Sequence, residues 1–428
     1  VVGGLNLPVD AVNLPDGRLL IAEKPGVLRL AVNGALRPDA FLDLRDRVND
    51  YWDRGLLGIT VDPAFTDNGY VYLFYVHEDD ALTYTGPKTS RVVRVTAVGD
   101  SADIDTEVVL VDGLPADSPS HDGGAIQFGP DGRLWITTGD ASTFNAVDPQ
   151  ALRAQQIDSL AGKLLRVDRD GRGLADNPFW NGDASAARSK VWAYGFRNPF
   201  RLTFRPATGR PYIADVGAND WEEINAVVRG GNHGWPCIEG SGPQAGYQSL
   251  AACQALYAVG AAGVAMPLVT YPHRAGTAAI SGGAFLSGPT LPESWRGTYA
   301  FGDFARGTLH HVAIDAADTS AGPIKGLATG IDGVVDVQAD PLGLQYVSVT
   351  AGGAVGYAAV WEETSATDAN AASVLRGRYV GLTGVLGGEF SVAAEPGAQQ
   401  HDAVTSGYFV DGTGGKPVID GINVVWVS

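Results

Sequence analysis

The sequence predicts an all-β protein, and within that class a six-bladed β-propeller with a small C-terminal β extension. The main observation is a repeated unit in which a turn rich in Pro, Asp and Gly precedes a β-rich run. Instances of this unit lie at 7–30, 62–76, 128–140, 204–217, 295–312 and 339–350. Recurrent short antiparallel meanders are typical of propellers, whose radial repetition leaves only short, protected strand edges. A β-sandwich is the alternative, but its single core would have to accommodate all of these units.

Helical periodicity is scarce, which is the second observation in favour of an all-β fold. Its best example is 149–161, which we interpret as an inserted helix or turn. Residues 1–361 contain every repeat and form the predicted propeller. After Trp361 the chain turns to small and polar residues (EETSATDANAAS), which are typical of a linker. Alternating runs follow at 387–394, 406–410 and 423–427, so we expect 362–428 to be a linker and appended β-strands of unknown role.

The composition excludes two classes of partner. The chain has 428 residues, of which 45% are hydrophobic and 18% charged, as in ordinary soluble globular proteins. Its formal net charge is −18, and nucleic-acid binding depends largely on Lys and Arg that neutralise phosphates, so we exclude nucleic acid as the main partner. No run of eighteen apolar residues is present, so we expect no membrane span.

Cys237 and Cys253 are the only cysteines, and they bracket a short segment rich in Gly, Ser and Gln. A disulfide that closes a loop of this length would contribute about 3 kcal/mol in the chain-entropy model. Two free thiols are the alternative. A disulfide implies an oxidising compartment, so we expect a secreted, periplasmic or cell-surface protein.

The stretch 190–235 contains the densest set of candidate functional residues. Arg197 and Asn198 precede a Pro, which disfavours helix and predicts a loop at a strand end that aims side chains into a cleft. Phe200, Leu202 and Phe204 then alternate with polar residues, which predicts a strand with one buried hydrophobic face.

A second predicted strand in this stretch runs into an oxygen-rich turn. Gly217 and Ala218 are followed by Asn219, Asp220 and the two carboxylates of 222–223. Backbone carbonyls with carboxylates close behind are ligands that calcium prefers. A solvated acidic loop is the alternative.

His121 is the best single candidate for a catalytic group. It stands in SPSHDGGAIQFGPDG, where two glycines leave room beside it and a strand begins. A His in this position can act as a general base near neutral pH, although a lone His is also common as a packing or surface residue. His233 and His273 lie in loops that can line a cleft. Asp53 and Arg54 are interpreted as a solvated charged pair, with the alternative that one of them lies in a cleft. Arg306 stands at a turn between strands, where it has either a surface role or a contact with a ligand.

Several motifs in the same order resemble the soluble glucose/sorbosone dehydrogenase family, the quinoprotein aldose dehydrogenases that use pyrroloquinoline quinone. The motifs are RGLLGITVDPAF at 54–65, SHDGGAIQFGPDG at 120–132, LAGKLLRVDRDG at 160–171, GFRNPFRLTF at 195–204, ADVGANDWEEIN at 214–225 and GGNHGWP at 230–236. The resemblance covers about 1–360 and leaves the tail outside it. It implies a six-bladed propeller with the quinone and calcium over the central channel.

The resemblance also implies roles for the candidate residues. His121 takes the proton of the anomeric hydroxyl while hydride passes to the quinone, and Arg197 stabilises the oxygen of the reduced cofactor. Asn198 contacts the quinone, and Asp53 and Arg306 fall at further cofactor-binding positions.

Two calcium sites follow from the same resemblance. The carbonyls of Gly217 and Ala218 match the ligands of a catalytic calcium. The region of Glu223 and His233 resembles a structural calcium site.

The chain departs from the family where the anionic quinone is held. Ala305 stands where the family has a Lys, and 333–335 read Gly-Val-Val where it has Arg-x-Arg. Asp53 replaces a Gln and Ser120 replaces an Asp. An acid beside an anionic cofactor is unfavourable, because like charges repel strongly in a low-dielectric cleft.

Three functions are therefore consistent with the sequence. The first is a quinone- and calcium-dependent dehydrogenase that oxidises an aldose or oligosaccharide and passes electrons to an external acceptor. The second is a calcium-binding propeller without redox activity that binds a carbohydrate or a protein partner. The third is a metal-dependent hydrolase or lactonase with His121 as its base.

Overall fold

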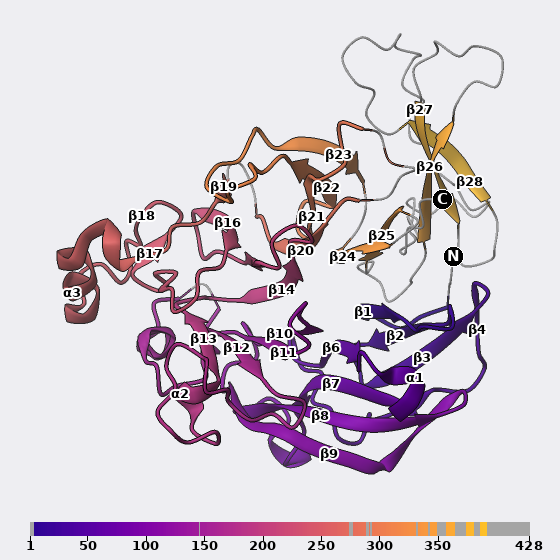
Figure 1. Ribbon diagram of the computed structural model, residues 1–428, viewed down its shortest axis with the longest axis horizontal. Coiled ribbons are helices and arrows are strands. Elements are labelled where there is room, and N and C mark those ends of the chain that lie inside the picture. The colour runs from indigo at the N-terminus through magenta and orange to yellow at the C-terminus, as the bar shows by residue number, and fades with distance from the viewer. Residues whose placement is uncertain are drawn as a thin grey trace.

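The computed structural model describes residues 4–144, 146–273, 277–287, 291, 293–330 and 333–340, together with strands at 343–348, 357–363, 374–380 and 386–391. Its architecture is a ring of antiparallel sheets (Figure 1). Five sheets of four or five strands follow one another along the chain. They are β1 (Pro8–Asn13), β2 (Leu19–Glu23), β3 (Val27–Val32), β4 (Ala35–Leu36) and β5 (Leu42–Asp43); β6 (Leu56–Val61), β7 (Tyr70–His77), β8 (Lys88–Val98) and β9 (Ser101–Ala116); β10 (Gly123–Phe128), β11 (Leu134–Thr138), β12 (Lys163–Val167) and β13 (Val191–Tyr194); β14 (Pro199–Phe204), β15 (Pro211–Asp215), β16 (Trp221–Ala226) and β19 (Val269–Pro272); and β20 (Ile280–Phe285), β21 (Tyr299–Asp303), β22 (Thr308–Val312) and β23 (Lys325–Thr329).

The innermost strands close the ring. Strands β1, β6, β10, β14 and β20 pack side by side in that order, and β24 (Val334–Asp340) packs against both β20 and β1. Among the strands that the structure describes, β24 pairs only with β25 (Gly343–Ser348). The prediction of a propeller is thus confirmed. Where six complete blades were predicted, the described residues form five, and a two-stranded sheet lies between the fifth and the first.

The repeated turn of the sequence has one structural meaning. In the five complete blades it connects, or lies close to, the innermost strand and the second strand, as between β10 and β11 or between β14 and β15. The sixth repeat falls on β24 and β25. Each blade repeats the same turn, so turns of similar composition recur along the chain. Their spacing is irregular because the long insertions lie in other connections, such as those between β12 and β13 and between β16 and β19.

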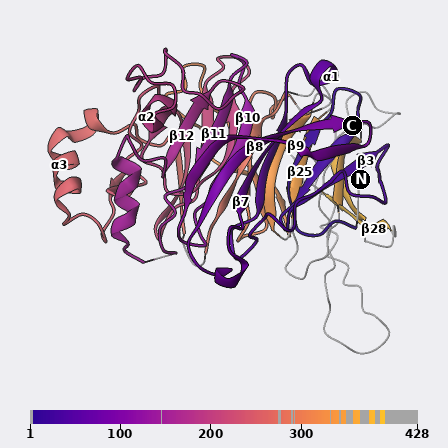
Figure 2. The same cartoon turned by 90° about the horizontal axis from the view of Figure 1, so that it is seen from below.

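The remaining elements are short. The helices and 3₁₀ turns are α1 (Phe65–Asn68), α2 (Ala187–Lys190), α3 (Ala251–Val259), Ala81–Thr83, Pro149–Gln155 and Gly260–Gly263, and the short strands β17 (Ile238–Glu239) and β18 (Gly242–Pro243) form a hairpin. The element predicted at 149–161 is the 3₁₀ turn Pro149–Gln155, which begins where the Asp148 carboxylate accepts the Gln150 N–H at 2.9 Å. Helix α3 projects from one side of the ring (Figure 2). No helix in the described part of the chain is long and apolar enough to cross a membrane.

A separate sheet follows the ring. It contains β26 (Tyr357–Glu363), β27 (Val374–Val380) and β28 (Leu386–Ser391). Strand β26 crosses the predicted domain boundary after Trp361, so the appended sheet begins before the linker-like composition does. The predicted runs at 406–410 and 423–427 lie outside the described residues.

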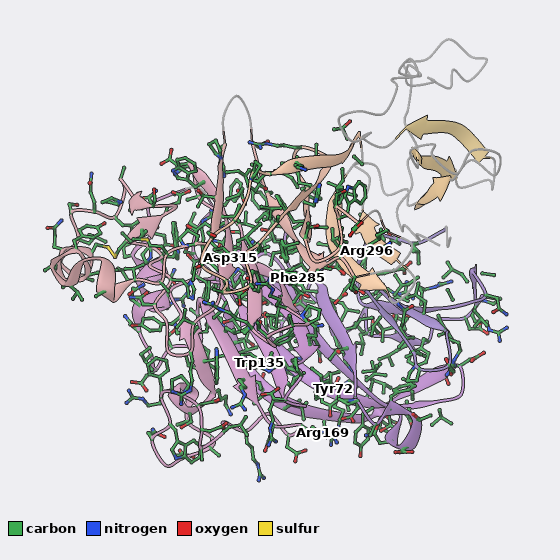
Figure 3. All side chains as sticks on the ribbon, turned by 45° about the horizontal axis from the view of Figure 1, so that its top comes forward. Tyr72, Trp135, Arg169, Phe285, Arg296 and Asp315 are labelled. Atoms are coloured by element: carbon green, nitrogen blue, oxygen red, sulfur yellow. A yellow bond between two sulfur atoms is a disulfide. The ribbon has the colours of Figure 1, made fainter. Side chains whose placement is uncertain are left out.

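The core lies between neighbouring blades, where side chains fill the space between the sheets (Figure 3). Tyr72, Leu134 and Leu165 belong to one such cluster between the second and third blades. Tyr212, Phe285 and Phe301 belong to another between the fourth and fifth. Each cluster is built from β-branched, aromatic and leucine side chains of two sheets, so no blade has a complete core of its own.

The predicted hydrophobic face of β14 is buried only in part, since Leu202 belongs to the core. Arg201 and Arg205 are buried, whereas Phe200 and Phe204 are only half-buried. The reason is tertiary: Arg201 forms an ion pair with Asp336 of β24 at 3.3 Å, and Arg205 forms one with Asp318. Buried charges are tolerated when they are paired and hydrogen-bonded, which the alternation of residue types along one strand does not show.

Candidate active site

Loops of the third and fourth blades enclose a cavity of about 210 Å³ at one end of the ring. It is lined by His121, Ser142, Thr143, Ala146, Val147, Arg197, Ala218, Asn219, Asp220, Trp235, Gln244, Ala245, Gly246 and Tyr247. His121 precedes β10 and Arg197 precedes β14, so the innermost strands of adjacent blades bring both residues to the cavity. The predicted juxtaposition of an imidazole and a guanidinium is therefore observed.

His121 is held in a constrained position. Its backbone has φ 61°, in the left-handed region that side chains rarely adopt. A Cβ at position 139 would lie 1.6 Å from the His121 carbonyl oxygen, so only Gly fits there. Strained backbone of this kind is characteristic of functional sites, because the surrounding structure must hold it in place.

The imidazole of His121 is oriented by a buried carboxylate. Its Nδ1 lies 2.9 Å from Oδ1 of Asp140. Burial, and then the positive charge of Arg197, lower the pKa of His121 below its ordinary value. The ring is therefore neutral at pH 7, with Nδ1–H donating to Asp140. Its buried Nε2 has no hydrogen-bond partner in the described part of the chain, so it is available to accept a proton.

Asp140 is a functional residue that the sequence analysis missed. Its Oδ2 accepts hydrogen bonds from Trp235 Nε1 at 2.6 Å and from Ser142 Oγ at 2.8 Å. Burial opposes ionisation, but His121, Arg197 and a hydrogen bond from the Ser142 backbone N–H together hold the pKa of Asp140 below its usual value. The sequence offers one indication of its role: Asp140 is the polar residue at the end of the 128–140 repeat, directly after strand β11.

Arg197 and Asn198 are fixed by one carboxylate. The two oxygens of Asp215 accept their backbone N–H groups at 3.0 and 2.7 Å. Asn198 does not line the cavity; its Oδ1 accepts the Gly123 N–H at 3.0 Å and fastens the His121 loop to β14. It is therefore a positioning residue in this structure.

The predicted calcium-binding turn is organised by Glu239, which the sequence analysis also missed. One oxygen of Glu239 accepts the backbone N–H groups of 218–221, at 2.8, 2.9, 3.0 and 3.2 Å. Arg197 Nη1 donates to the carbonyl oxygen of Gly217 at 2.7 Å. Ala218 lines the cavity. The turn thus presents its carbonyl side toward Arg197 and its N–H side toward a buried carboxylate.

Glu223 and His233 lie behind this turn and do not contact each other directly. Both are hydrogen-bonded to Asn225, whose Nδ2 donates to Glu223 at 3.2 Å and whose Oδ1 lies 3.0 Å from His233 Nδ1. Burial, and then the nearby charge of Asp215, raise the pKa of Glu223 to about 8. Burial lowers the pKa of His233 to about 3. In the described part of the chain, no three His, Cys, Asp or Glu side chains are arranged to hold a metal ion.

Four other candidates do not line the cavity. Arg306 lies in the turn between β21 and β22 of the fifth blade, where its side chain donates to the Pro272 carbonyl at 2.6 Å. Asp53 precedes β6 next to the His121 loop, and its N–H donates to the Pro119 carbonyl at 3.1 Å. Its charge acts on the imidazole of His121, although Asp53 does not itself line the cavity. Arg54, interpreted as solvated, is 0% exposed and donates to the Ala116 carbonyl at 2.8 Å. His273 pairs with Glu222 at 2.6 Å.

The predicted disulfide is confirmed. Cys237 and Cys253 are bonded, with their Cα atoms 5.0 Å apart. The loop that the bond closes contributes Gln244 and Tyr247 to the cavity wall. The bond therefore restrains one side of the site.

Asp122, next to His121, is buried, and neither of its oxygens has a hydrogen-bond partner in the described residues. Burial, and then the charge of Asp53, raise its pKa from 3.8 to about 8. Between these values the folded protein binds a proton that the unfolded chain releases, so stability falls as pH rises. The cost is at most about 1.4 kcal/mol per pH unit between the two pKa values.

We expect Asp122→Asn to raise the free energy of unfolding, by an amount that increases from pH 4 to pH 8. The substitution removes the ionisation but keeps the shape of the side chain. Urea denaturation at each pH measures the difference, with Asp39→Asn on the exposed surface as the matched control. An equal effect of Asp122→Asn at pH 4 and pH 8 would contradict the expectation.

The fold and the site together define a propeller whose cavity combines a carboxylate-oriented His with an Arg beside a carbonyl-rich turn. The glucose/sorbosone dehydrogenase family model matches residues 5–355. The chain belongs to this family.

Two curated relatives and one solved structure illustrate the similarity. An uncharacterised protein of Synechocystis is 30% identical over 327 residues, which are 74% of this chain and 75% of that protein. Quinoprotein glucose dehydrogenase B of Acinetobacter calcoaceticus is 30% identical over 264 residues, and the match spans 58% of this chain but only 54% of that enzyme. A solved glucose dehydrogenase structure is 26% identical, with a TM-score of 0.67, and the match covers 82% of this chain and 96% of that one.

Proposed function

We propose that this protein is a sugar dehydrogenase that depends on pyrroloquinoline quinone and calcium and oxidises the anomeric carbon of an aldose or an oligosaccharide. The observation that carries the proposal is the unpartnered Nε2 of His121, which is oriented by Asp140 and shares a cavity with Arg197. This arrangement supplies a base and a cation at one place. The name of the Acinetobacter relative, a quinoprotein glucose dehydrogenase, supports the same reaction class.

The residues of the cavity fit a quinone at its reactive end. Arg197 supplies positive charge, and Trp235 and Tyr247 supply flat apolar walls suited to a planar ring system. Less positive charge is available to pair with the three carboxylates of the quinone than the family provides. Ala305 is neutral, and Val334 and Val335 are buried apolar residues. We therefore expect the quinone to bind through its ring and reactive oxygens more than through its carboxylates.

The chain's own residues perform the proton chemistry. His121 Nε2 accepts the proton of the anomeric hydroxyl as the C1–H bond breaks, and Asp140 stabilises the imidazolium that forms. Arg197 is placed to stabilise negative charge on an oxygen in the cavity. A bound quinone would supply the hydride acceptor for C1, so that the aldose would lose two electrons and two protons in total and leave as the lactone, and the two electrons would pass on to an external acceptor.

Calcium is proposed at the turn that contains Gly217 and Ala218. The carbonyl oxygen of Gly217 already attracts the Arg197 guanidinium, and a carbonyl is a ligand type that calcium prefers. For a second ion near Glu223 and His233, the support is electrostatic. Asp215 and Glu239 lie close enough to Glu223 for their negative charges to raise its pKa. A divalent cation would relieve the repulsion among these three carboxylates.

The test is a titration of the purified chain with the quinone at fixed calcium, followed by dye reduction with glucose and other aldoses. We expect sugar-dependent reduction that requires both additions and is abolished by a calcium chelator. Metal analysis of the same sample measures the calcium bound. Absence of both quinone binding and dye reduction at high micromolar quinone would overturn the proposal.

A second candidate is a calcium-binding propeller without redox activity that binds a carbohydrate or a protein partner. It is favoured by one observation, the replacement of the expected cations by Ala305 and the buried pair Val334 and Val335. Calcium binding without quinone binding in the same titration would select it. A metal-dependent hydrolase or lactonase is distinguished by hydrolysis of lactones without an electron acceptor.

We also propose that residues 1–361 form a six-bladed propeller and that the following strands form the extension. The contacts of β24 with both β20 and β1 support a sixth position in the ring, and the family match ends at residue 355. The disulfide supports a secreted, periplasmic or cell-surface location, because such bonds persist in oxidising compartments.

A further inference from the structure

A series of aromatic rings leads from the protein surface to His121. We call Tyr84, Tyr51, Trp52 and Phe144 the aromatic strip. Its successive ring centroids are 5.9, 6.4 and 6.1 Å apart. The last ring, Phe144, lies 6.4 Å from the imidazole of His121. The strip is thus continuous with the candidate active site.

Three of the four rings of the strip are exposed and Tyr51 is half-buried, which distinguishes the strip from the aromatic rings of the core. Trp52 is 57% exposed, Phe144 52% and Tyr84 40%. Contiguous apolar side chains on the surface of a soluble protein usually mark an interaction site. Rings that protrude this far contribute little to packing.

The backbone of Trp52 gives independent support. Its φ is 56°, in the left-handed region that Gly, Asn and Asp tolerate best. The chain therefore keeps a large ring in a strained and exposed position next to the site, where a Gly would fold with less strain. Strain of this kind at a site is evidence for a functional requirement.

The polar surroundings identify the class of ligand. The Tyr84 hydroxyl donates to the carboxylate of Asp50, and Asp53 lies beside Trp52. These acids accept hydrogen bonds from hydroxyl groups and repel anions. The electron-rich face of an aromatic ring attracts the C–H groups of a sugar ring. Together these groups suit a neutral, polyhydroxylated ligand rather than an acidic saccharide.

We propose that the aromatic strip binds the sugar rings that follow the reducing end of a neutral oligosaccharide, while the terminal ring places C1 at His121. The preferred substrate class is then an oligosaccharide with a free reducing end. This inference rests on the proposed function for the chemistry at His121. The binding platform itself depends only on the strip.

The test compares kcat/KM for maltotriose and cellotriose with kcat/KM for glucose. In Trp52→Gly and in Phe144→Ala we expect the ratio of trisaccharide to glucose to fall about tenfold or more, as for an aromatic hot spot worth more than 1 kcal/mol. Phe304→Ala is the matched control, because Phe304 is a 49% exposed aromatic residue outside the strip. An unchanged ratio in both strip variants overturns the inference.

Calorimetric titration of the chain with each trisaccharide, without quinone or acceptor, separates this inference from the proposed function. We expect binding that weakens about tenfold or more in Trp52→Gly, whereas the melting temperature stays the same or rises, since Gly adopts positive φ without strain. Binding without turnover would overturn the proposed function and leave the platform standing. Turnover of glucose without trisaccharide binding would overturn the binding platform and leave the proposed function standing. Absence of turnover and of binding would overturn the two proposals together.

Discussion

His121→Ala is expected to lower kcat by about a thousandfold in the quinone- and calcium-loaded protein, within the range of a lost general base. The reason is geometric, since Nε2 of His121 is a buried acceptor in the cavity and Nδ1 is engaged by Asp140 at 2.9 Å. Asp140→Asn is expected to cause a smaller but still large loss, because the amide no longer stabilises the imidazolium or selects the tautomer. Steady-state dye reduction with glucose measures both effects.

The pH profile adds a readout specific to the imidazole. The base must be neutral to accept a proton, and its pKa lies below the ordinary 6.5. We therefore expect the decline of kcat at acidic pH to begin at a lower pH than an ordinary imidazole of pKa 6.5 would give. His310→Ala serves as control, because His310 lies on the fifth blade and does not line the cavity. A kcat of His121→Ala equal to that of the unaltered chain would remove His121 from the mechanism.

Arg201→Leu is expected to lower the free energy of unfolding by about 3–5 kcal/mol, the usual cost of removing one partner of a buried ion pair. Arg201 connects four sheets at the centre of the ring. Its guanidinium donates to the Val9 carbonyl of β1 and to the Leu57 carbonyl of β6 at 3.4 Å, and it pairs with Asp336 of β24 at 3.3 Å. Urea denaturation measures the loss.

The loss in Arg201→Leu depends on the carboxylates left behind. Burial, and then the charge of Asp336, already raise the pKa of Asp10 to about 7. Without the guanidinium both carboxylates are harder to ionise, so the destabilisation is expected to be smaller at pH 5 than at pH 8. Adding Asp336→Asn to Arg201→Leu is expected to recover part of the stability. The control Arg45→Ala breaks an exposed pair with Asp43 and is expected to cost at most about 1 kcal/mol. Equal losses in Arg201→Leu and Arg45→Ala would contradict the central role of Arg201.

Much of the fold was predictable, because the repeats carry local information. The turn at 128–140 and the turn at 204–217 each specify a hairpin between an innermost strand and its neighbour. Hairpins of this kind depend on residues close in sequence. Six complete blades were predicted, whereas the described residues form five blades and the two-stranded sheet of β24 and β25; closure of the ring depends on which strands pair after β24.

The candidate site was predicted in part. His121 and Arg197 were identified because each stands at a strand entry in a distinctive motif, and the structure brings both to one cavity. Asp140 and Glu239 were missed because their roles depend on partners 18 or more residues away, His121 and the turn at 218–221. Arg306 was assigned by motif position alone; it lies in the β21–β22 turn of the fifth blade, and its cofactor contact stays a prediction.

The sequence by itself determined the all-β class and the repeated hairpins, favoured the disulfide between Cys237 and Cys253, and identified His121 and Arg197 as candidate catalytic residues. Turn chemistry, strand periodicity and loop closure are local or pairwise properties that residue types reveal. Only the tertiary structure decided that Arg201 is buried while Phe200 is half-buried, and that an aromatic strip reaches the His121 loop. The physical reason is that the burial and pairing of side chains depend on which blades are adjacent in space, and the sequence of a single strand does not show which strands lie beside it.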